Sequence, residues 1–202
     1  MLLKGGFKRI IINAVPGNHG RDSKYADKVT NWDFVLYNSL RIATRNYSEI
    51  EWNIACFLED NEEMDNSLDN KYFVLLNPPF IFMHGNGIKM YNQVPWYGLT
   101  RRIFKWKSIL PEIKVACLGH FHTSFRWRIA GVETIASASM VTDDDFALER
   151  LGEHSIAEQS IFGWNERNQK ITWRFMIDVD ERDENERKPL IYSKAKQFEQ
   201  LK

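Results

Sequence analysis

The chain has 202 residues, of which 44% are hydrophobic and 13% aromatic, and this composition is typical of one globular domain rather than of a disordered protein. Lys and Arg together number 27, as do Asp and Glu, so no overall charge attracts the protein to nucleic acid or to a membrane. No apolar run reaches about 18 residues, so we expect no membrane-spanning segment, and the N-terminal residues lack the pattern of a signal peptide. We therefore expect a cytoplasmic protein, in the host cytoplasm if a phage encodes it, with reduced thiols at Cys56 and Cys117.

The first quarter of the chain predicts two strands and one helix. Residues 8–15 form a β-branched run that opens into a Pro-Gly loop, which indicates a buried strand. Residues 27–45 carry apolar side chains three and four positions apart, so we expect an amphipathic helix capped by Asp27 or Thr30. Residues 51–58 predict a second strand.

The rest of the chain predicts several more strands and a second helix. Residues 71–84 contain two apolar runs separated by Asn-Pro-Pro, which favours two strands joined by a tight turn. Residues 97–109 have the spacing of a basic amphipathic helix. Strand patterns follow at 115–118, 125–129, 132–139, 158–164 and 171–179. We expect one domain over residues 1–178 and a charged tail over residues 179–202.

Four of the five histidines occur in three short motifs, each of which follows an apolar run. In α/β proteins, the ends of strands are where functional sites assemble. Neutral imidazole and amide oxygen suit first-row divalent ions, so the pattern predicts a metal site. We expect Gly119 to release the backbone so that two nearby histidines converge. The motifs are Gly17-Asn18-His19, His84-Gly85 and Gly119-His120-Phe121-His122.

These motifs, in this order, resemble those of the calcineurin-like metallophosphoesterases, the superfamily that includes the SbcD-type nucleases and many phage phosphoesterases. The phage members are the nearer likeness, and the resemblance covers roughly residues 8–178. It implies an α/β fold in which two mixed sheets form a β-sandwich flanked by helices (αββα). The matching stretches are residues 15–21, 83–85, 94–98 and 119–123.

The resemblance also implies roles for individual residues. Asn18, His84 and His120 would bind one metal ion, His122 would bind a second, and His19 would lie beside the scissile phosphate as an acid or charge stabiliser. The implied activity is metal-dependent hydrolysis of phosphoric esters, most simply a nuclease-like cleavage of phosphodiesters. The implied cofactor is a divalent transition metal, Mn²⁺ first, with Fe, Zn or Ni as alternatives.

The sequence departs from the family in its first motifs. The family opens with an Asp-x-His block and a Gly-Asp block, and neither occurs in the sixteen residues that precede Gly17. Those blocks supply the carboxylates that bridge and balance two metal ions. We therefore expect an N-terminally truncated fold with an incomplete two-metal site, completed by an N-terminal companion fragment. An acidic residue usually follows Gly-Asn-His; Gly20 stands there, and Asp22 is the nearest substitute.

Substrate contacts are predicted at Arg21, Tyr97, Arg101 and Arg102. Residues 96–107 interleave basic and aromatic side chains, a composition that can hold a phosphate backbone and stack bases. The same stretch is equally consistent with the solvated face of an amphipathic helix.

Two other functions remain open. The missing carboxylates favour a catalytically inactive remnant, or a nucleic-acid-binding accessory protein that keeps the fold without the chemistry. A single-metal site of Asn18, His84 and His120, with Asp22, is the third alternative. The run at residues 143–145 is expected to be a solvated turn, and His154 a surface residue.

Overall fold

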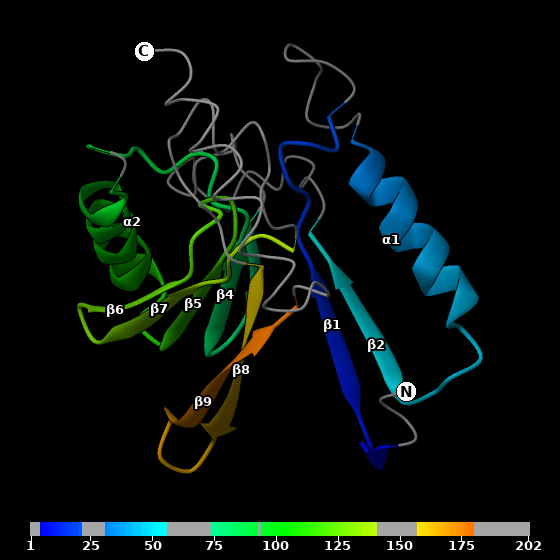
Figure 1. Ribbon diagram of the computed structural model, residues 1–202. Helices are drawn as coiled ribbons and strands as arrows, with labels where there is room; N and C mark the ends of the chain where they lie inside the picture. Colours follow the sequence, from blue (N-terminus) through cyan, green and yellow to red (C-terminus); the bar gives the residue numbers. More distant parts are fainter. Residues whose placement is uncertain (1–4, 22–30, 56–73, 93, 141–156, 180–202) are drawn as a thin grey trace, which may run out of the picture.

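The computed structural model describes residues 5–21, 31–55, 74–92, 94–140 and 157–179. Within these ranges the protein is α/β, with two helices, a mixed sheet of five strands and two sheets of two strands (Figure 1). The arrangement as a sandwich of two sheets remains a prediction. Several predicted features lie outside the described residues: Asp22, Cys56, residues 143–145, His154 and the tail beyond residue 179.

The five-stranded sheet is built mainly from the predicted apolar runs. Its order is β3-β4-β5-β7-β6, in which β4, β5 and β7 are parallel while β3 and β6 pair antiparallel at the two edges. The tight turn predicted between β3 and β4 is confirmed. The strands are β3 (Val74–Asn77), β4 (Phe80–Met83), β5 (Val115–Leu118), β6 (Phe125–Ile129) and β7 (Val132–Ala136).

One face of this sheet packs against α2 (Trp96–Ile109) and forms the main core. The inner side of the helix contributes Leu99, Ile103 and Trp106, all at most 2% exposed. These side chains meet apolar residues of β4 and β5, so the helix is fixed by burial of its apolar stripe. Neither described helix is long and apolar enough to cross a membrane.

The other face of the sheet meets a hairpin of β8 (Glu158–Asn165) and β9 (Lys170–Asp178). Phe80 on β4 contacts two aromatic rings of β8, Phe162 at 6.4 Å and Trp164 at 5.2 Å between ring centroids. Burial on β5 raises the pKa of the free thiol of Cys117 to about 12.

A separate unit is formed by β1 (Ile10–Ala14), α1 (Trp32–Ala43) and β2 (Ile50–Ile54), with the two strands parallel (Figure 1). The predicted helix is confirmed but begins later than expected. Its N-cap is Asn31, whose side chain accepts a hydrogen bond from the backbone N–H of Asp33 at 2.9 Å. The predicted caps Asp27 and Thr30 were therefore wrong.

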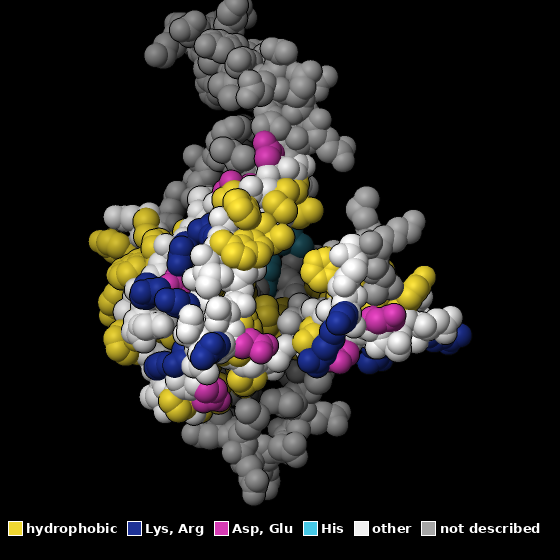
Figure 2. All heavy atoms as spheres, turned by 90° about the horizontal axis from the view of Figure 1, so that it is seen from below, with side chains coloured by type: hydrophobic (Ala, Val, Ile, Leu, Met, Phe, Trp, Pro, Cys, Tyr) yellow, Lys and Arg dark blue, Asp and Glu magenta, His cyan; other side chains and the backbone are white. Residues whose placement is uncertain are grey.

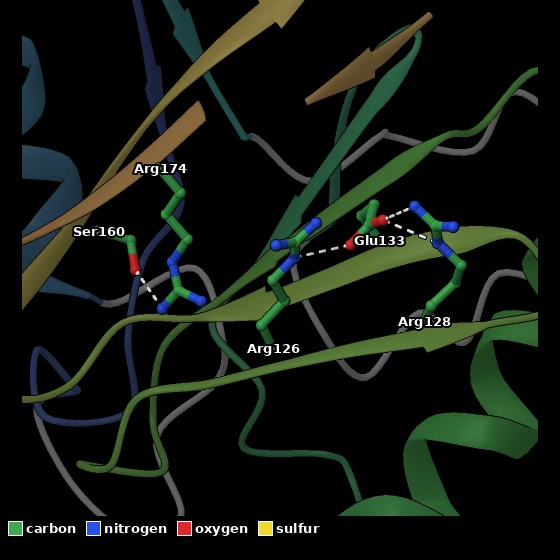
Figure 3. A network of polar contacts seen from close by, with 5 residues as sticks. All are labelled: Arg126, Arg128, Glu133, Ser160 and Arg174. Atoms are coloured by element: carbon green, nitrogen blue, oxygen red, sulfur yellow. Dashed lines mark hydrogen bonds and ion pairs between the residues drawn. The ribbon is translucent and has the colours of Figure 1, made fainter. Parts of the chain in front are cut away.

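The β6–β7 pair carries an ion-pair network around one buried carboxylate (Figure 3). Glu133 on β7 is only 6% exposed and accepts hydrogen bonds from Arg126 and Arg128 of β6. Burial alone would raise the pKa of Glu133, but the hydrogen bonds from the two guanidinium groups outweigh it and the pKa is lowered. On the neighbouring hairpin, Arg174 of β9 donates to the hydroxyl of Ser160 on β8.

Candidate metal centre

The three histidine motifs meet at one place, although they lie far apart in the sequence. Oδ1 of Asn18 is 2.6 Å from Nε2 of His84 and 3.1 Å from Nδ1 of His120. Asn18 follows β1, His84 follows β4 and His120 follows β5, so three neighbouring strand ends each deliver one polar atom. The predicted convergence of these three residues is what the structure shows.

The remaining two histidines lie beside this group. The rings of His84 and His120 are 5.0 Å apart between centroids, and those of His19 and His122 are 6.3 Å apart. His19 is exposed, whereas Nδ1 of His122 is inaccessible to solvent. His19 is therefore the histidine of this pair that an approaching ligand meets first.

The backbone of the Gly-His-Phe-His motif differs from the expectation. His120 and His122 themselves adopt positive φ angles of 74° and 55°, while Gly119 does not. Left-handed conformations are uncommon for residues with a Cβ and cost about 1 kcal/mol or more each. The turn is thus made by the histidines, and the role predicted for Gly119 was wrong.

Helix α1 holds the loop that carries Asn18 and His19. The side-chain amide of Asn31 donates to the backbone oxygen of Gly17 at 2.8 Å, and Asp33 accepts from the N–H of Gly17 at 2.6 Å. The backbone of the loop also joins the helix, because the oxygen of Gly20 accepts from the N–H of Trp32 at 2.7 Å. Sequence reasoning missed Asn31 and Asp33, because it started the helix at residue 27; the available signal was the preference for Asn at an N-cap.

Close packing explains why a glycine, Gly20, follows the Gly17-Asn18-His19 motif. A Cβ added at Gly20 would lie 2.6 Å from Oδ1 of Asp33 and would also clash with Asn31. Any side chain at position 20, including the usual acidic one, would therefore displace the two residues that hold the loop. The carboxylate of this loop region is supplied from α1 by Asp33, but it is directed at the backbone of Gly17.

The electrostatic environment keeps the imidazoles of His84 and His120 neutral. Burial, with the positive charge of neighbouring histidines and of Arg21, lowers the pKa of His84 to about 4. The pKa of His120 is lowered for the same reasons, burial first. Neutral imidazole is the form that binds a metal ion, so both groups are in that form at neutral pH.

The predicted substrate residues fall in two places. Arg21 belongs to the site, because its Nε donates to the backbone oxygen of Asn18 at 2.9 Å and its charge acts on His84 and His120. Tyr97, Arg101 and Arg102 lie on α2, which Figure 1 places on the opposite side of the five-stranded sheet from β1 and β2.

The residues present fit a single first-row metal ion held by Asn18, His84 and His120. Oδ1 of Asn18 lies at hydrogen-bond distance from one nitrogen of each imidazole, 2.6 and 3.1 Å away, so the three donor atoms already face one another. The set is neutral, and nowhere in the described ranges do three or more His, Cys, Asp or Glu side chains gather as a metal-binding group. A site of two imidazoles and one amide binds metal more weakly than one that contains carboxylates.

A cleft of about 460 Å³ leads to this site. It separates the β1–α1–β2 unit from β4 and β5, and histidine side chains are visible within the hollow in Figure 2. Its walls are formed by residues 12–15 and by mostly apolar residues of α1, β2, β4 and β5. These include Tyr37, Leu40, Trp52, Phe82, Cys117 and Leu118.

No family model matches the chain, and no curated protein matches it. Among solved structures, a conserved uncharacterized protein from Streptococcus pneumoniae, described as a predicted phosphoesterase, overlaps 83% of this chain and 95% of its own, with 8% identity and a TM-score of 0.34. A single mutant of Vps29 from Entamoeba histolytica overlaps 83% of this chain and 97% of its own, with 11% identity and a TM-score of 0.34.

Proposed function

We propose that this chain is the histidine-bearing part of a metal-dependent phosphoesterase of the calcineurin-like type, which hydrolyses phosphodiesters. The observation that carries the proposal is the convergence of Oδ1 of Asn18 with Nε2 of His84 and Nδ1 of His120. The order of the three motifs in the sequence supports the same family.

In this proposal Asn18, His84 and His120 hold the first divalent metal and His122 contributes to the second, with Mn²⁺ the first choice. When bound, the metal supplies positive charge beside the phosphate and acidifies water. Arg21 and His19 are exposed near the ligand group. Arg21 attracts the phosphate anion, and His19 donates a proton or hydrogen bond to the leaving oxygen.

The neutral ligand set favours a companion segment that supplies carboxylates. The edge of β1 that faces away from β2 is open to pairing, because β1 pairs only with β2 among the described strands. The N–H of Ile10 and the oxygen of Ala14 both bond to the β2 segment. Alternate residues of a strand direct their main-chain groups to opposite edges, so Ile11 and Asn13 offer theirs to the cleft.

The catalytic proposal is tested by hydrolysis of a bis-aryl phosphodiester with Mn²⁺. The chain is assayed alone and with a polypeptide that carries Asp-x-His and Gly-Asp motifs. We expect turnover with the companion, and its loss in His19→Ala and His120→Ala. The matched control is His154→Ala, which changes the one histidine outside the motifs. No turnover under either condition overturns the proposal.

Docking of the companion is tested separately by hydrogen exchange. Binding should protect the amides of Ile11 and Asn13, which face the cleft, more than that of Ile12, which faces β2. Proline is tolerated at the open edge of a strand, so Ile11→Pro should block docking and keep the β1–β2 pair. Ile11→Val, which retains the N–H, should bind the companion normally. Protection that is equal at all three amides, or unchanged in Ile11→Pro, contradicts this mode of binding.

A catalytically inactive protein is the second candidate, favoured by the lack of a carboxylate-containing metal group within the described ranges. Metal analysis after gel filtration separates the two. An inactive protein should carry well below one equivalent of transition metal even in the presence of the companion, whereas the phosphoesterase should retain it.

A further inference from the structure

We propose that the outer face of α2 binds single-stranded nucleic acid, at a surface separate from the histidine cluster. We define the α2 surface as Tyr97, Arg101, Phe104 and Lys105, four exposed side chains on that helix. The proposal does not depend on hydrolysis at the metal centre.

The α2 surface exposes aromatic rings where a helix ordinarily presents polar side chains. Tyr97 is 74% exposed and Phe104 is 59% exposed. With 3.6 residues per turn, positions 97, 101, 104 and 105 lie on one side of the helix, and the buried positions Leu99, Ile103 and Trp106 lie on the other. The exposed rings are therefore additional to the apolar stripe that fixes the helix to the sheet.

The charge of α2 is entirely positive. The helix contains two arginines and two lysines and no acidic residue, in a chain whose basic and acidic residues are equal in number. Lys107 is used locally, because its Nζ donates to the backbone oxygens of Pro111 and Ile113. Arg101 and Lys105 are exposed beside the rings, so the α2 surface complements a polyanion.

The spacing on the helix suits alternating bases and phosphates. At a rise of about 1.5 Å per residue, Tyr97 and Phe104 are about 10 Å apart along the axis with Arg101 between them. Stacking of bases on aromatic rings tolerates any sequence, and cations between the rings neutralise the backbone. A membrane is the less suitable partner, since the apolar stripe that would enter it is already buried against the sheet.

Aromatic packing holds the start of α2 against β6. At the start of the helix, the ring of Trp96 meets that of Trp127 on β6 at 5.1 Å between centroids, and Trp127 stacks on Phe125 at 4.2 Å. Together with the buried residues of α2, these contacts fix the helix before a ligand arrives. A helix that is already held in place needs no ordering of its backbone on binding.

The experiment measures binding of a fluorescein-labelled oligothymidylate to the whole chain by anisotropy at low salt. We expect Tyr97→Ala and Phe104→Ala each to weaken binding about tenfold, while Tyr97→Phe, which keeps the ring, binds as the parent does. Arg101→Gln should reduce the slope of log affinity against log salt by about one. The matched control is Phe175→Ala on β9, because Phe175 is also exposed, at 65%.

Binding of the oligonucleotide should be the same with and without a chelator, which separates this surface from the candidate metal centre. The thermal midpoint of each variant shows whether it is folded, and Tyr97→Phe preserves the test if Tyr97→Ala unfolds. The proposal is overturned by an absence of binding at low salt, by parent-level binding in both Tyr97→Ala and Phe104→Ala, or by retention on anionic lipid vesicles in preference to the oligonucleotide.

Discussion

The backbone N–H of Gly17 donates a 2.6 Å hydrogen bond to the carboxylate of Asp33, which lies in the first turn of α1. A carboxylate at this end of a helix is favoured by the helix dipole, and here it also fixes the loop that presents Asn18 and His19. The position of Asn18 and His19 therefore depends on where α1 begins.

Loss of the Asn31 side chain should loosen this loop. Asn31→Ala removes the N-cap bond to Asp33 and the bond to the oxygen of Gly17, so we expect the free energy of unfolding to fall by about 1–2 kcal/mol. Asn38→Ala is the matched control on the same helix, where the amide bonds only to the oxygen of Phe34 one turn earlier. Urea unfolding of both variants measures the difference; equal values would show that Asn31 does not hold the loop.

A methyl group at position 20 should disturb the same contacts. Gly20→Ala places its Cβ 2.6 Å from Asp33, which forces the loop or the helix terminus to move and should cost about 1–3 kcal/mol. Gly5→Ala adds the same methyl group where only ordinary contacts near 3.5 Å await it, and it should change stability by less than about 0.5 kcal/mol. Thermal unfolding compares the stabilities of the two variants. A Gly20→Ala variant as stable as the parent would refute the close packing.

The metal-free protein should lose stability in mild acid. The pKa of His84 is about 4 when folded against an ordinary 6.5, so below pH 6.5 the unfolded chain binds the proton more readily than the folded one. This pKa difference leaves the free energy of unfolding nearly unchanged above pH 7 and lowers it by about 2 kcal/mol at pH 5. Urea unfolding with a chelator, at pH 7 and pH 5, should show a smaller loss in His84→Gln. An identical pH dependence in the variant would contradict the depressed pKa.

Glycine at position 122 should relieve the left-handed backbone there and stabilise the loop, although the imidazole of His122 is lost. His122→Gly and His122→Ala both remove the imidazole, but only alanine retains the cost of φ 55°. We expect the glycine variant to be more stable than the alanine variant by about 1 kcal/mol. Differential scanning calorimetry gives the comparison, and the reverse order would argue against strain at this position.

Glu133 should contribute more to the free energy of unfolding than Arg128, its partner in the ion-pair network. Glu133 is buried between two arginines, so Glu133→Gln removes its charge and should cost about 2 kcal/mol. The side chain of Arg128 is 68% exposed, and Arg128→Ala should cost less than about 1 kcal/mol. Chemical unfolding of both variants tests the order of these effects.

Sequence patterns located the strands well because their signals are local. The run 115–118 is apolar between Lys114 and Gly119, and β5 has those bounds. The convergence of Asn18, His84 and His120 was also predictable, because each follows such a run. The roles of Asn31 and Asp33 were not, since they depend on a loop that lies about fourteen to sixteen residues earlier in the chain. The left-handed turn at His120 was likewise missed, because side chains rarely adopt it.

Aromatic contacts run from the metal centre to α2: His120 meets Phe121, Phe121 meets Phe125, and Phe125 stacks on Trp127 beside Trp96. Two indoles 5.1 Å apart in a fixed edge-to-face arrangement couple their electronic transitions. We therefore expect the near-ultraviolet circular dichroism of this pair to report any change in the position of Trp127 relative to Trp96, without an added label.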